Sequence, residues 1–317
     1  MEKKHNIDNI LKKLPIHNIL SYSRIDTLSC PRKYKIKYVD KNYPKVDSLA
    51  LNLGSLCHKG LELKYQGEDI NSIWNKMLNG CKDGETTLLG INQLKEEYPF
   101  DFEEINSKSG LTYEDKLKTY KNQLFTEQLE EDWEVIGTET EFLILFNNKV
   151  LIKGFIDRVD RNKISGEIRV IDYKTNNKEF EKAKLATPLQ MYIYSLACYK
   201  MYGKFPSSCI YDLIFLGEKQ IGGTKGYLDR GFKKLNKLLD EIIYYQEIGT
   251  EQMIPKPTPL CYWCDFCKQN PNSLDENFHL CEHYSLWTPY EKTFKVNKDW
   301  IAPSSEDDGW GDIEGWD

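Results

Sequence analysis

Two neighbouring segments between residues 154 and 177, GFIDRVDRNKISGEIRVIDYKTNN, carry charged side chains where β-strands usually carry apolar ones. Asp157 ends the first short β-rich run, and Asp172 and Lys174 end the second. Side chains two residues apart on a strand lie on the same face, so Asp172 and Lys174 should point the same way. If the two strands pair through the polar turn between them, Asp157 should lie beside Asp172.

Two carboxylates in a partly buried place repel each other unless a cation lies between them. A divalent metal ion removes the repulsion, and ligation by oxygen favours Mg²⁺ or Mn²⁺. Lys174 would then reach the same phosphate as the metal, where its ammonium could polarise an attacking water and offset developing negative charge. The alternative is a surface salt bridge between Asp172 and Lys174. On these residues alone that alternative is favoured, because D-x-K occurs often by chance.

Five short motifs follow one another along the chain. They are SYSRIDTLSCPRKYKIKYV at residues 21–39, Gly54-Ser-Leu-Cys-His58, Gly154-Phe-Ile-Asp157, Asp172-Tyr-Lys174 and Gln190-Met-Tyr-Ile-Tyr194. This arrangement resembles the PD-(D/E)XK nuclease superfamily, and within it the RecB-like branch. That branch includes the CRISPR adaptation nucleases and the nuclease domains of helicase–nuclease recombination complexes. The resemblance covers scattered blocks from about residue 21 to residue 281.

The resemblance implies a metal site. Asp157 and Asp172 would be ligands, joined by the main-chain carbonyl of Tyr173, and Lys174 would orient the nucleophilic water. His58 would be a further ligand and would shift the preference towards Mn²⁺, since imidazole is a softer ligand than carboxylate. Taken alone, His58 would be interpreted as a structural histidine.

The resemblance also gives roles to residues around the metal. Gln190 and Tyr194, one turn apart on one helical face, would hold a DNA phosphate or the lysine, although alone they would be ordinary residues of a helix surface. Glu62 is one helical turn from His58 and could act as a partner of that histidine or as an outer ligand. Glu141 is a weaker candidate and is left outside the proposed set.

Four of the nine cysteines are clustered within residues 261–281, with spacings typical of a metal or iron–sulfur site. Cys261, Cys264, Cys267 and Cys281 alone could bind a structural Zn²⁺. The resemblance instead implies a [4Fe-4S] cluster in which Cys30 joins three C-terminal ligands. These are Cys261, Cys264 and Cys281, with Cys267 as the alternative to Cys281. We favour the iron–sulfur cluster and expect it to lock the two ends of the domain together.

The composition is typical of a soluble protein with unevenly placed charge. The mean hydropathy is −0.60, no apolar run approaches the roughly 18 residues that span a membrane, and the N-terminus does not resemble a signal peptide. Residues 306–317 contain six acidic residues and no basic ones, so this tail accounts for the net charge of −6. We expect a cytoplasmic protein without membrane contact. Abundant lysine, asparagine and isoleucine suggest a low-GC bacterium, or a phage in a bacterial host.

The pattern of apolar residues predicts an α/β protein. Strands are expected at 135–146, 149–160, 168–175 and 209–217, with a turn at Asn147-Asn148, and helices at 49–66, 187–203 and 228–249. The resemblance implies a restriction-endonuclease-like core, with a mixed central β-sheet flanked by helices and a C-terminal cysteine cluster packing near the N-terminal helices. The expected divisions are a weakly ordered lead-in (1–20), a RecB-like nuclease domain (21–290) with a helical insertion at about 67–130 and a cysteine-rich segment at 255–285, and a disordered acidic tail (300–317).

Together these features predict a metal-dependent DNA nuclease that hydrolyses phosphodiester bonds. The chain lacks the G-x-x-x-x-G-K-[ST] phosphate loop. It would therefore act alone on single strands or DNA ends, with exonuclease action favoured, or receive DNA from a separate helicase. Basic residues interleaved with Tyr34, Tyr38 and Tyr43 could guide a strand by phosphate contacts and stacking. The acidic tail with its tryptophans could bind a protein partner, or act only as a solubilising end.

Two other functions are compatible with the sequence. One is a catalytically inactive DNA-binding or assembly subunit on the same fold, which the intact Asp157, Asp172 and Lys174 argue against. The other is a zinc-stabilised interaction protein in which D-x-K is coincidental. DNA recombination, DNA repair and phage DNA metabolism are the processes that the resemblance implies.

Overall fold

The computed structural model describes residue 7, residues 10–42 and 48–256, and the single positions 258, 261, 264, 266 and 281. The chain divides into two compact units, residues 1–254 and 255–317. The helices and strands named below belong to the first unit, and none of its described helices is long and apolar enough to cross a membrane. The predicted packing of the cysteine cluster near the N-terminal helices, Cys267 and the acidic tail at 300–317 lie outside the described residues.

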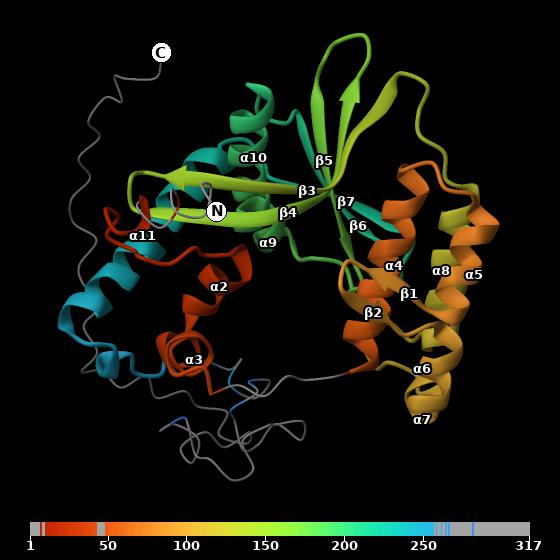
Figure 1. Ribbon diagram of the computed structural model, residues 1–317, viewed down its shortest axis with the longest axis horizontal. Coiled ribbons are helices and arrows are strands. Elements are labelled where there is room, and N and C mark those ends of the chain that lie inside the picture. Colours follow the sequence, from red (N-terminus) through yellow and green to blue (C-terminus); the bar gives the residue numbers. More distant parts are fainter. Residues whose placement is uncertain are drawn as a thin grey trace. The chain divides into compact units, whose positions relative to one another are not determined.

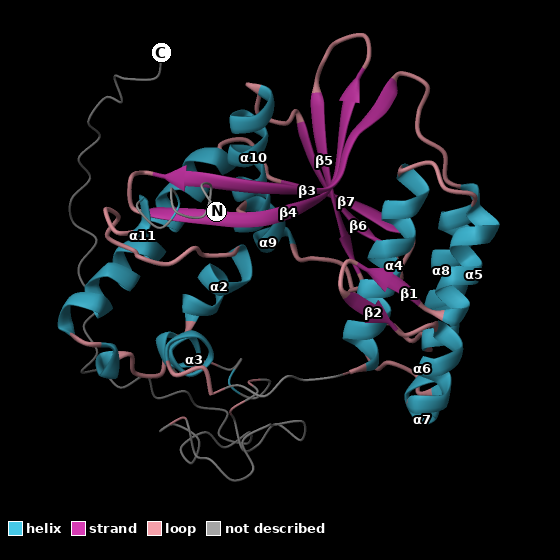
Figure 2. Ribbon diagram, viewed as in Figure 1, coloured by secondary structure: helices cyan, strands magenta, loops and turns pink. Residues whose placement is uncertain are grey.

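A five-stranded sheet forms the centre of the first unit (Figures 1 and 2). In spatial order its strands are β3 (Trp133–Phe146), β4 (Val150–Asn162), β5 (Ile168–Lys174), β6 (Ser208–Leu213) and β7 (Glu218–Gly222). β5 and β6 are parallel, and the other neighbouring pairs are antiparallel. The parallel pair requires a crossover, which contains α9 (Lys182–Ala186) and α10 (Leu189–Tyr202). The predicted α/β fold with a mixed sheet flanked by helices is confirmed.

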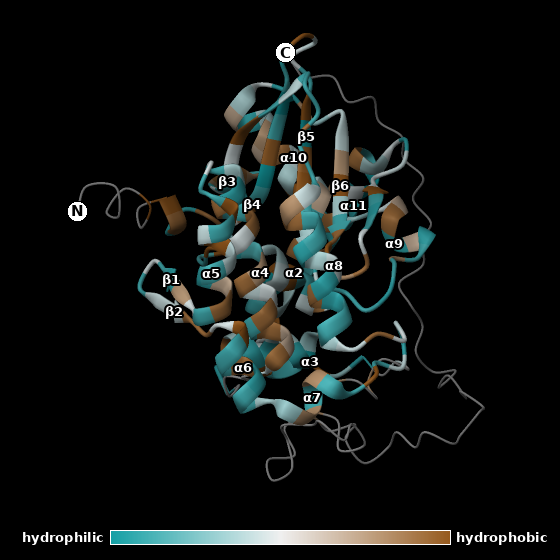
Figure 3. Cartoon of the chain, turned by 90° about the vertical axis from the view of Figure 1, so that its right-hand side faces the viewer, coloured by the Kyte–Doolittle hydropathy of each residue, from teal (hydrophilic) through white to brown (hydrophobic). Residues whose placement is uncertain are grey.

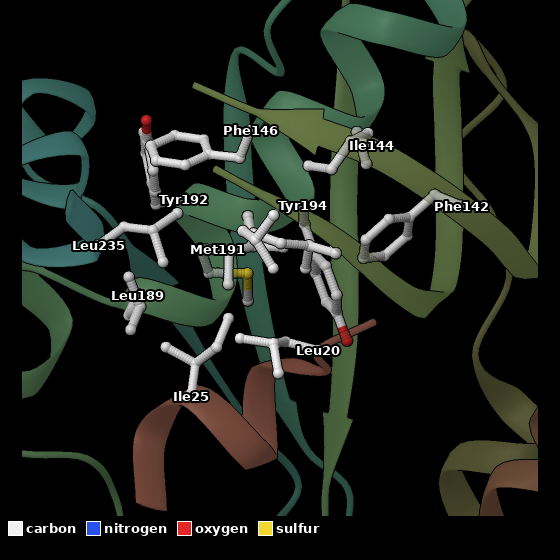
Figure 4. Close-up of a cluster of buried hydrophobic side chains, with 14 of the residues drawn as sticks. Leu20, Ile25, Phe142, Ile144, Phe146, Leu189, Met191, Tyr192, Tyr194 and Leu235 are labelled. Atoms are coloured by element: carbon white, nitrogen blue, oxygen red, sulfur yellow. The ribbon is translucent and has the colours of Figure 1, made fainter. Parts of the chain in front are cut away.

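A buried apolar cluster joins the sheet to α2 (Tyr22–Asp26), α10 and α11 (Tyr227–Ile248) (Figure 4). α11 contributes Leu235, Leu239 and Ile242, whose spacing places them on one helical face. Leu20 also belongs to this cluster, and its main chain bonds to β4 on both sides: its N–H donates to Leu151 O and its carbonyl accepts from Lys153 N, each at 2.9 Å. Part of the segment 1–20 therefore lies against the sheet.

A second buried cluster joins β5 and the residues after β6 to a separate group of helices. The members of this group are α4 (Leu49–Tyr65), α5 (Ile70–Asn79), α6 (Ile91–Glu97), α7 (Pro99–Glu103) and α8 (Tyr113–Thr126), with a small hairpin of β1 (Cys81–Asp83) and β2 (Thr86–Leu88). Figure 3 views the molecule from the side of these helices, where apolar segments alternate with polar ones. Ile171 and Tyr173 point into this cluster while Val170 belongs to the first, so β5 is buried on both faces.

The expected elements differ from the observed ones mainly at the sheet edge. The turn at Asn147 and Asn148 forms with positive φ values of 45° and 51°, which suit the left-handed conformations of a tight hairpin turn. The fourth predicted strand ends at Leu213 rather than at residue 217, and β7 follows it. β7 was not predicted, because EKQIG at an exposed edge has no apolar alternation.

Gly154 shows why a glycine begins the G-x-x-D motif. A Cβ atom here would lie 2.6 Å from Phe142 Cζ, in a buried ring that packs against Tyr194. At Gly54, by contrast, a Cβ atom would meet Thr175 Oγ1 at 3.5 Å, which is an ordinary contact. We expect Gly154→Ala to lower the free energy of unfolding by about 1–3 kcal/mol through overpacking. Gly54→Ala, within a helix, should leave it unchanged or raise it by up to about 1 kcal/mol. Urea denaturation of both variants measures the difference, and equal effects would contradict it.

Candidate active site

Asp157 lies where the ladder between β4 and β5 ends. The last paired residues there are Arg158 and Ile171, and beyond them the Asp157 Oδ2 atom accepts a hydrogen bond from Tyr173 N at 2.6 Å. The carboxylate thus replaces a main-chain carbonyl as the partner of β5. Burial raises the pKa of Asp157 well above its usual range, and the negative charge of Asp172 raises it further. A cation beside Asp157 would offset both effects.

Asp172 is 1% exposed, and helix α10 and Lys174 hold its two oxygens. Oδ1 accepts hydrogen bonds from Gln190 Nε2 at 2.8 Å and from Tyr194 OH at 3.3 Å, and Gln190 also donates to the Tyr194 hydroxyl at 2.9 Å. Oδ2 lies 2.5 Å from Lys174 Nζ as an ion pair, without the geometry of a hydrogen bond. The same-face placement of Asp172 and Lys174 agrees with the sequence pattern. Gln190 and Tyr194 contact the carboxylate of Asp172, where the sequence suggested the lysine or a phosphate.

His58 projects from α4 towards β4 and β5. Its Nδ1 atom is 3.6 Å from Asp157 Oδ2, and its ring meets the Tyr173 ring edge-on, with the centroids 5.8 Å apart. Burial lowers the pKa of His58, although the charge of Asp172 and a hydrogen bond with the main chain of Tyr173 act in the opposite direction. A neutral imidazole is the form that binds a metal ion.

Glu139 lies together with His58 and Asp157, and the sequence analysis did not identify it as a candidate ligand. One ligand atom each of His58, Glu139 and Asp157 lie within 4.8 Å of one another. In the β3–β4 ladder, Thr138 pairs with Arg158 and Thr140 with Ile156, which places Glu139 opposite Asp157. Burial, followed by the charge of Asp157, raises the pKa of Glu139 to about 7.

The backbone at Glu139 has a positive φ of 43° inside a strand. This conformation is uncommon for residues other than glycine and costs free energy, so it persists only where the surrounding structure imposes it. Glu141, the weaker candidate from the sequence, is exposed and forms an ion pair with Lys153. Alternation along a strand cannot separate Glu139 from Glu141, because both positions have the same parity.

Glu62 lies beside this group and not in it. Lys59 Nζ is 2.7 Å from Glu62 Oε2 and 3.1 Å from Asp83 Oδ1, so the carboxylate of Glu62 is already neutralised by a lysine. The charges of Glu62 and Asp83 nevertheless raise the pKa of Glu139. The acidic surroundings therefore favour a cation at the neighbouring group of His58, Glu139 and Asp157.

The donors of this group suit a hard divalent cation. Two carboxylates and one imidazole are ligands that Mn²⁺ accepts, and Mg²⁺ accepts the carboxylates. The two carboxyl groups are buried enough to hold raised pKa values, which a bound cation would lower. Asp172 and Lys174 lie next to the group, so an ammonium stands beside the place where the cation would bind.

The predicted cysteine ligands are described in part. Cys30 is partly buried and is the residue before α3 (Pro31–Tyr34) in the first unit. In the second unit Cys261, Cys264 and Cys281 are partly buried. Cys264 N donates to Cys261 O at 3.0 Å, and Thr258 N donates to the sulfur of Cys261 at 3.4 Å.

Comparison with known proteins assigns the chain to a family. The model of the PD-(D/E)XK nuclease superfamily matches residues 19–269, which include every predicted motif from residue 21 to Tyr194. The chain belongs to this superfamily. The resemblance predicted from the motifs is therefore confirmed, and the superfamily supports a nuclease-type function.

Curated relatives of this PD-(D/E)XK protein are ATP-dependent helicase/deoxyribonuclease subunits B. The proteins from Clostridium perfringens strains ATCC 13124, 13 and SM101 are each 26% identical to it over 191 residues. The match covers 54% of this chain and 16% of each relative. The chain thus corresponds to a small part of these relatives, and their complete activity is not transferred by the similarity.

Proposed function

We propose that the protein is a metal-dependent DNA nuclease that hydrolyses phosphodiester bonds, acting as an exonuclease on single-stranded DNA or DNA ends. The observation that carries this proposal is the group of His58, Glu139 and Asp157 beside the Asp172–Lys174 ion pair. Membership of the PD-(D/E)XK superfamily supports a nuclease. The biological setting that we propose is DNA recombination, repair or phage DNA metabolism.

The proposed metal ligands are His58, Glu139 and Asp157, together with Asp172 and the main-chain carbonyl of Tyr173. A bound Mg²⁺ or Mn²⁺ would polarise the phosphate and make water a better nucleophile at neutral pH. The other roles in the reaction would fall to side chains of the protein.

Lys174 would orient the attacking water and offset the negative charge that develops on the phosphate. Its ammonium is held 2.5 Å from Asp172 Oδ2. Gln190 and Tyr194 fix the other oxygen of Asp172, so they would act as positioning residues that set where Lys174 stands. This arrangement joins four polar side chains, two from one helical turn and two from one strand, in a single network.

A nuclease assay on the full chain tests the proposal. Labelled single-stranded and duplex DNA are incubated with Mn²⁺, with Mg²⁺ or with EDTA. We expect cleavage that requires the metal and is lost in Asp157→Asn, which keeps an acceptor for the Tyr173 N–H but removes the negative charge. DNA binding without cleavage in any metal would instead support the alternative of a catalytically inactive DNA-binding or assembly subunit. If the protein neither bound nor cleaved DNA, both the nuclease and the inactive DNA-binding subunit would be refuted.

Two partners are also proposed. Because the curated relatives are subunits of a helicase/deoxyribonuclease, a separate helicase could supply the DNA strand. The acidic tail at 300–317, which lies outside the described residues, could bind another protein. Deletion of residues 305–317 should then weaken partner binding without lowering cleavage of free DNA by the isolated protein.

We also propose a structural [4Fe-4S] cluster held by Cys30, Cys261, Cys264 and Cys281, with Cys267 as the alternative to Cys281. The hydrogen bond between Cys264 N and Cys261 O, with the Thr258 N–H directed at the Cys261 sulfur, is compatible with thiolate ligands. A structural Zn²⁺ is the alternative cofactor.

Anaerobically purified protein should therefore be brown, with broad absorption near ~400 nm, as for thiolate-bound iron. Cys264→Ser should lose the colour and lower the melting temperature, because a cluster contributes to folding as other structural metal sites do. Metal analysis of the same sample provides the check. Colourless protein with stoichiometric zinc would contradict the iron–sulfur assignment.

A further inference from the structure

Among the residues that the structure describes, two lysines near the candidate site have no carboxylate partner. Lys184 is on α9 and Lys234 is on α11, and both side chains are exposed. Among the residues that the structure describes, no carboxylate oxygen lies within 4.0 Å of either ammonium. An exposed lysine that neutralises no acid in the described part of the chain is available to an external anion.

Lys184 is held in place more firmly than an ordinary surface lysine. Its Nζ atom lies 4.0 Å from the centre of the Phe180 ring, a cation–π contact. Phe180 is itself fixed, since its ring is 4.8 Å from that of Tyr211 and its N–H donates to Gln220 Oε1 at 2.7 Å. The ammonium is therefore positioned before a ligand arrives, which reduces the entropy lost on binding.

Lys234 lies on α11, which Arg230 ties to the last residue of α9 and to the residue after it. The Arg230 guanidinium donates to Ala186 O at 2.9 Å and to Thr187 Oγ1 at 3.0 Å. Lys234 follows Arg230 by four residues and so lies on the same face of α11. Gln190, three residues after Thr187, is the side chain that holds Asp172.

The charges of this region interact with those of the candidate site. Partial burial lowers the pKa of Lys184, and the positive charges of Lys174 and Lys234 lower it further, while Asp26 and Asp172 raise it. The packing connects the same groups: Lys184 lies over Phe180, Phe180 packs on Tyr211, and Tyr211 pairs with Asp172 in the β5–β6 ladder. Asp172 forms an ion pair with Lys174. Of the two acids that raise the pKa of Lys184, Asp26 is therefore the one that is not paired with Lys174.

We propose that Lys184 and Lys234 bind backbone phosphates of the DNA strand next to the phosphate that is cut. Two exposed positive charges without a carboxylate partner among the described residues suit a chain of phosphates, and lysine binds phosphate as a point charge without reading the base. The contact would be independent of sequence and would hold the strand in register with Asp157 and Lys174. This inference rests on the proposed nuclease function and adds the path of the substrate strand.

The salt dependence of DNA binding tests the inference. Binding of a fluorescein-labelled single-stranded oligonucleotide is measured by anisotropy in EDTA, which prevents cleavage, between about 50 and 200 mM salt. The double variant Lys184→Gln/Lys234→Gln is compared with Lys108→Gln/Lys200→Gln, which removes two exposed charges elsewhere. The slope of log K against log salt is negative, and for single strands each lost phosphate contact reduces its magnitude by about 0.7. The magnitude for the Lys184→Gln/Lys234→Gln variant should therefore fall by about 1.4.

The outcomes separate the inference from the proposed function. A slope for the Lys184/Lys234 variant that equals that of its control overturns the inference, and cleavage by the wild type then still supports the nuclease. A reduced slope with a raised KM for cleavage supports the strand path. A wild-type protein that neither binds nor cleaves DNA overturns both. Duplex DNA in the same assay shows whether the path accepts one strand or two.

Discussion

Replacing Lys174 by glutamine is expected to lower the rate of DNA cleavage by about 10²–10³-fold, the usual effect of removing one group that stabilises developing charge. Glutamine keeps most of the length of the side chain but removes the ammonium that lies 2.5 Å from Asp172 Oδ2. The loss should appear in kcat. DNA binding in EDTA should change much less, because one phosphate contact of many is affected. Single-turnover cleavage and anisotropy measure the two effects.

Lys153→Gln is a suitable control for this experiment. Lys153 is also a strand lysine in an ion pair, with Glu141, but its side chain is 46% exposed and its partner is outside the proposed metal group. The control should cleave DNA as the wild type does. Circular dichroism and melting temperature establish that both variants are folded, since removing Lys174 leaves the buried carboxylate of Asp172 without its counter-charge. Retention of full cleavage by Lys174→Gln would remove the catalytic role of the lysine.

The parts of the site that the sequence predicted are those defined by local spacing. Asp172 and Lys174 share a face because the period of a strand is two residues, and Gln190 and Tyr194 share a face because they are one helical turn apart. In the structure the two pairs meet at the carboxylate of Asp172, which forms an ion pair with Lys174 and accepts hydrogen bonds from Gln190 and Tyr194. The mixed sheet could also be predicted, because the motifs that identify the superfamily are themselves local.

Glu139 could not be predicted, because its position depends on the register between two strands. A two-residue turn at Asn147-Asn148 would pair Phe146 with Lys149 and place Glu139 opposite Ile156. The structure pairs Phe146 with Val150, a shift of one residue that places Glu139 opposite Asp157 instead. One residue of register changes every cross-strand neighbour, so a turn length taken from Asn147-Asn148 alone places Glu139 opposite the wrong residue. The positive φ of Glu139 is likewise imposed by the surrounding structure.

The second large effect is expected for Glu139→Gln, which should weaken Mn²⁺ binding by about 100-fold, at the upper end of the losses seen for groups around a metal. The carboxylate of Glu139 lies within 4.8 Å of the ligand atoms of His58 and Asp157, and the amide of glutamine is a poorer ligand without charge. Wild-type protein should melt at a higher temperature in Mn²⁺ than in EDTA, because the ion binds the folded state. The variant should lose most of that increase and require more Mn²⁺ for cleavage.

Glu141→Gln is the matched control, since it removes the same group two residues away on the same strand. Glu141 is exposed and paired with Lys153, so this variant should keep the wild-type response to Mn²⁺. A third variant, Glu139→Gly, removes the carboxylate and also accepts a φ of 43° without strain. In EDTA it should be as stable as the wild type or more stable, by up to about 1–3 kcal/mol, while failing to bind Mn²⁺. If Glu141→Gln rather than Glu139→Gln abolished the Mn²⁺ response, the ligand would be the exposed carboxylate, and the strained backbone at Glu139 would need another cause.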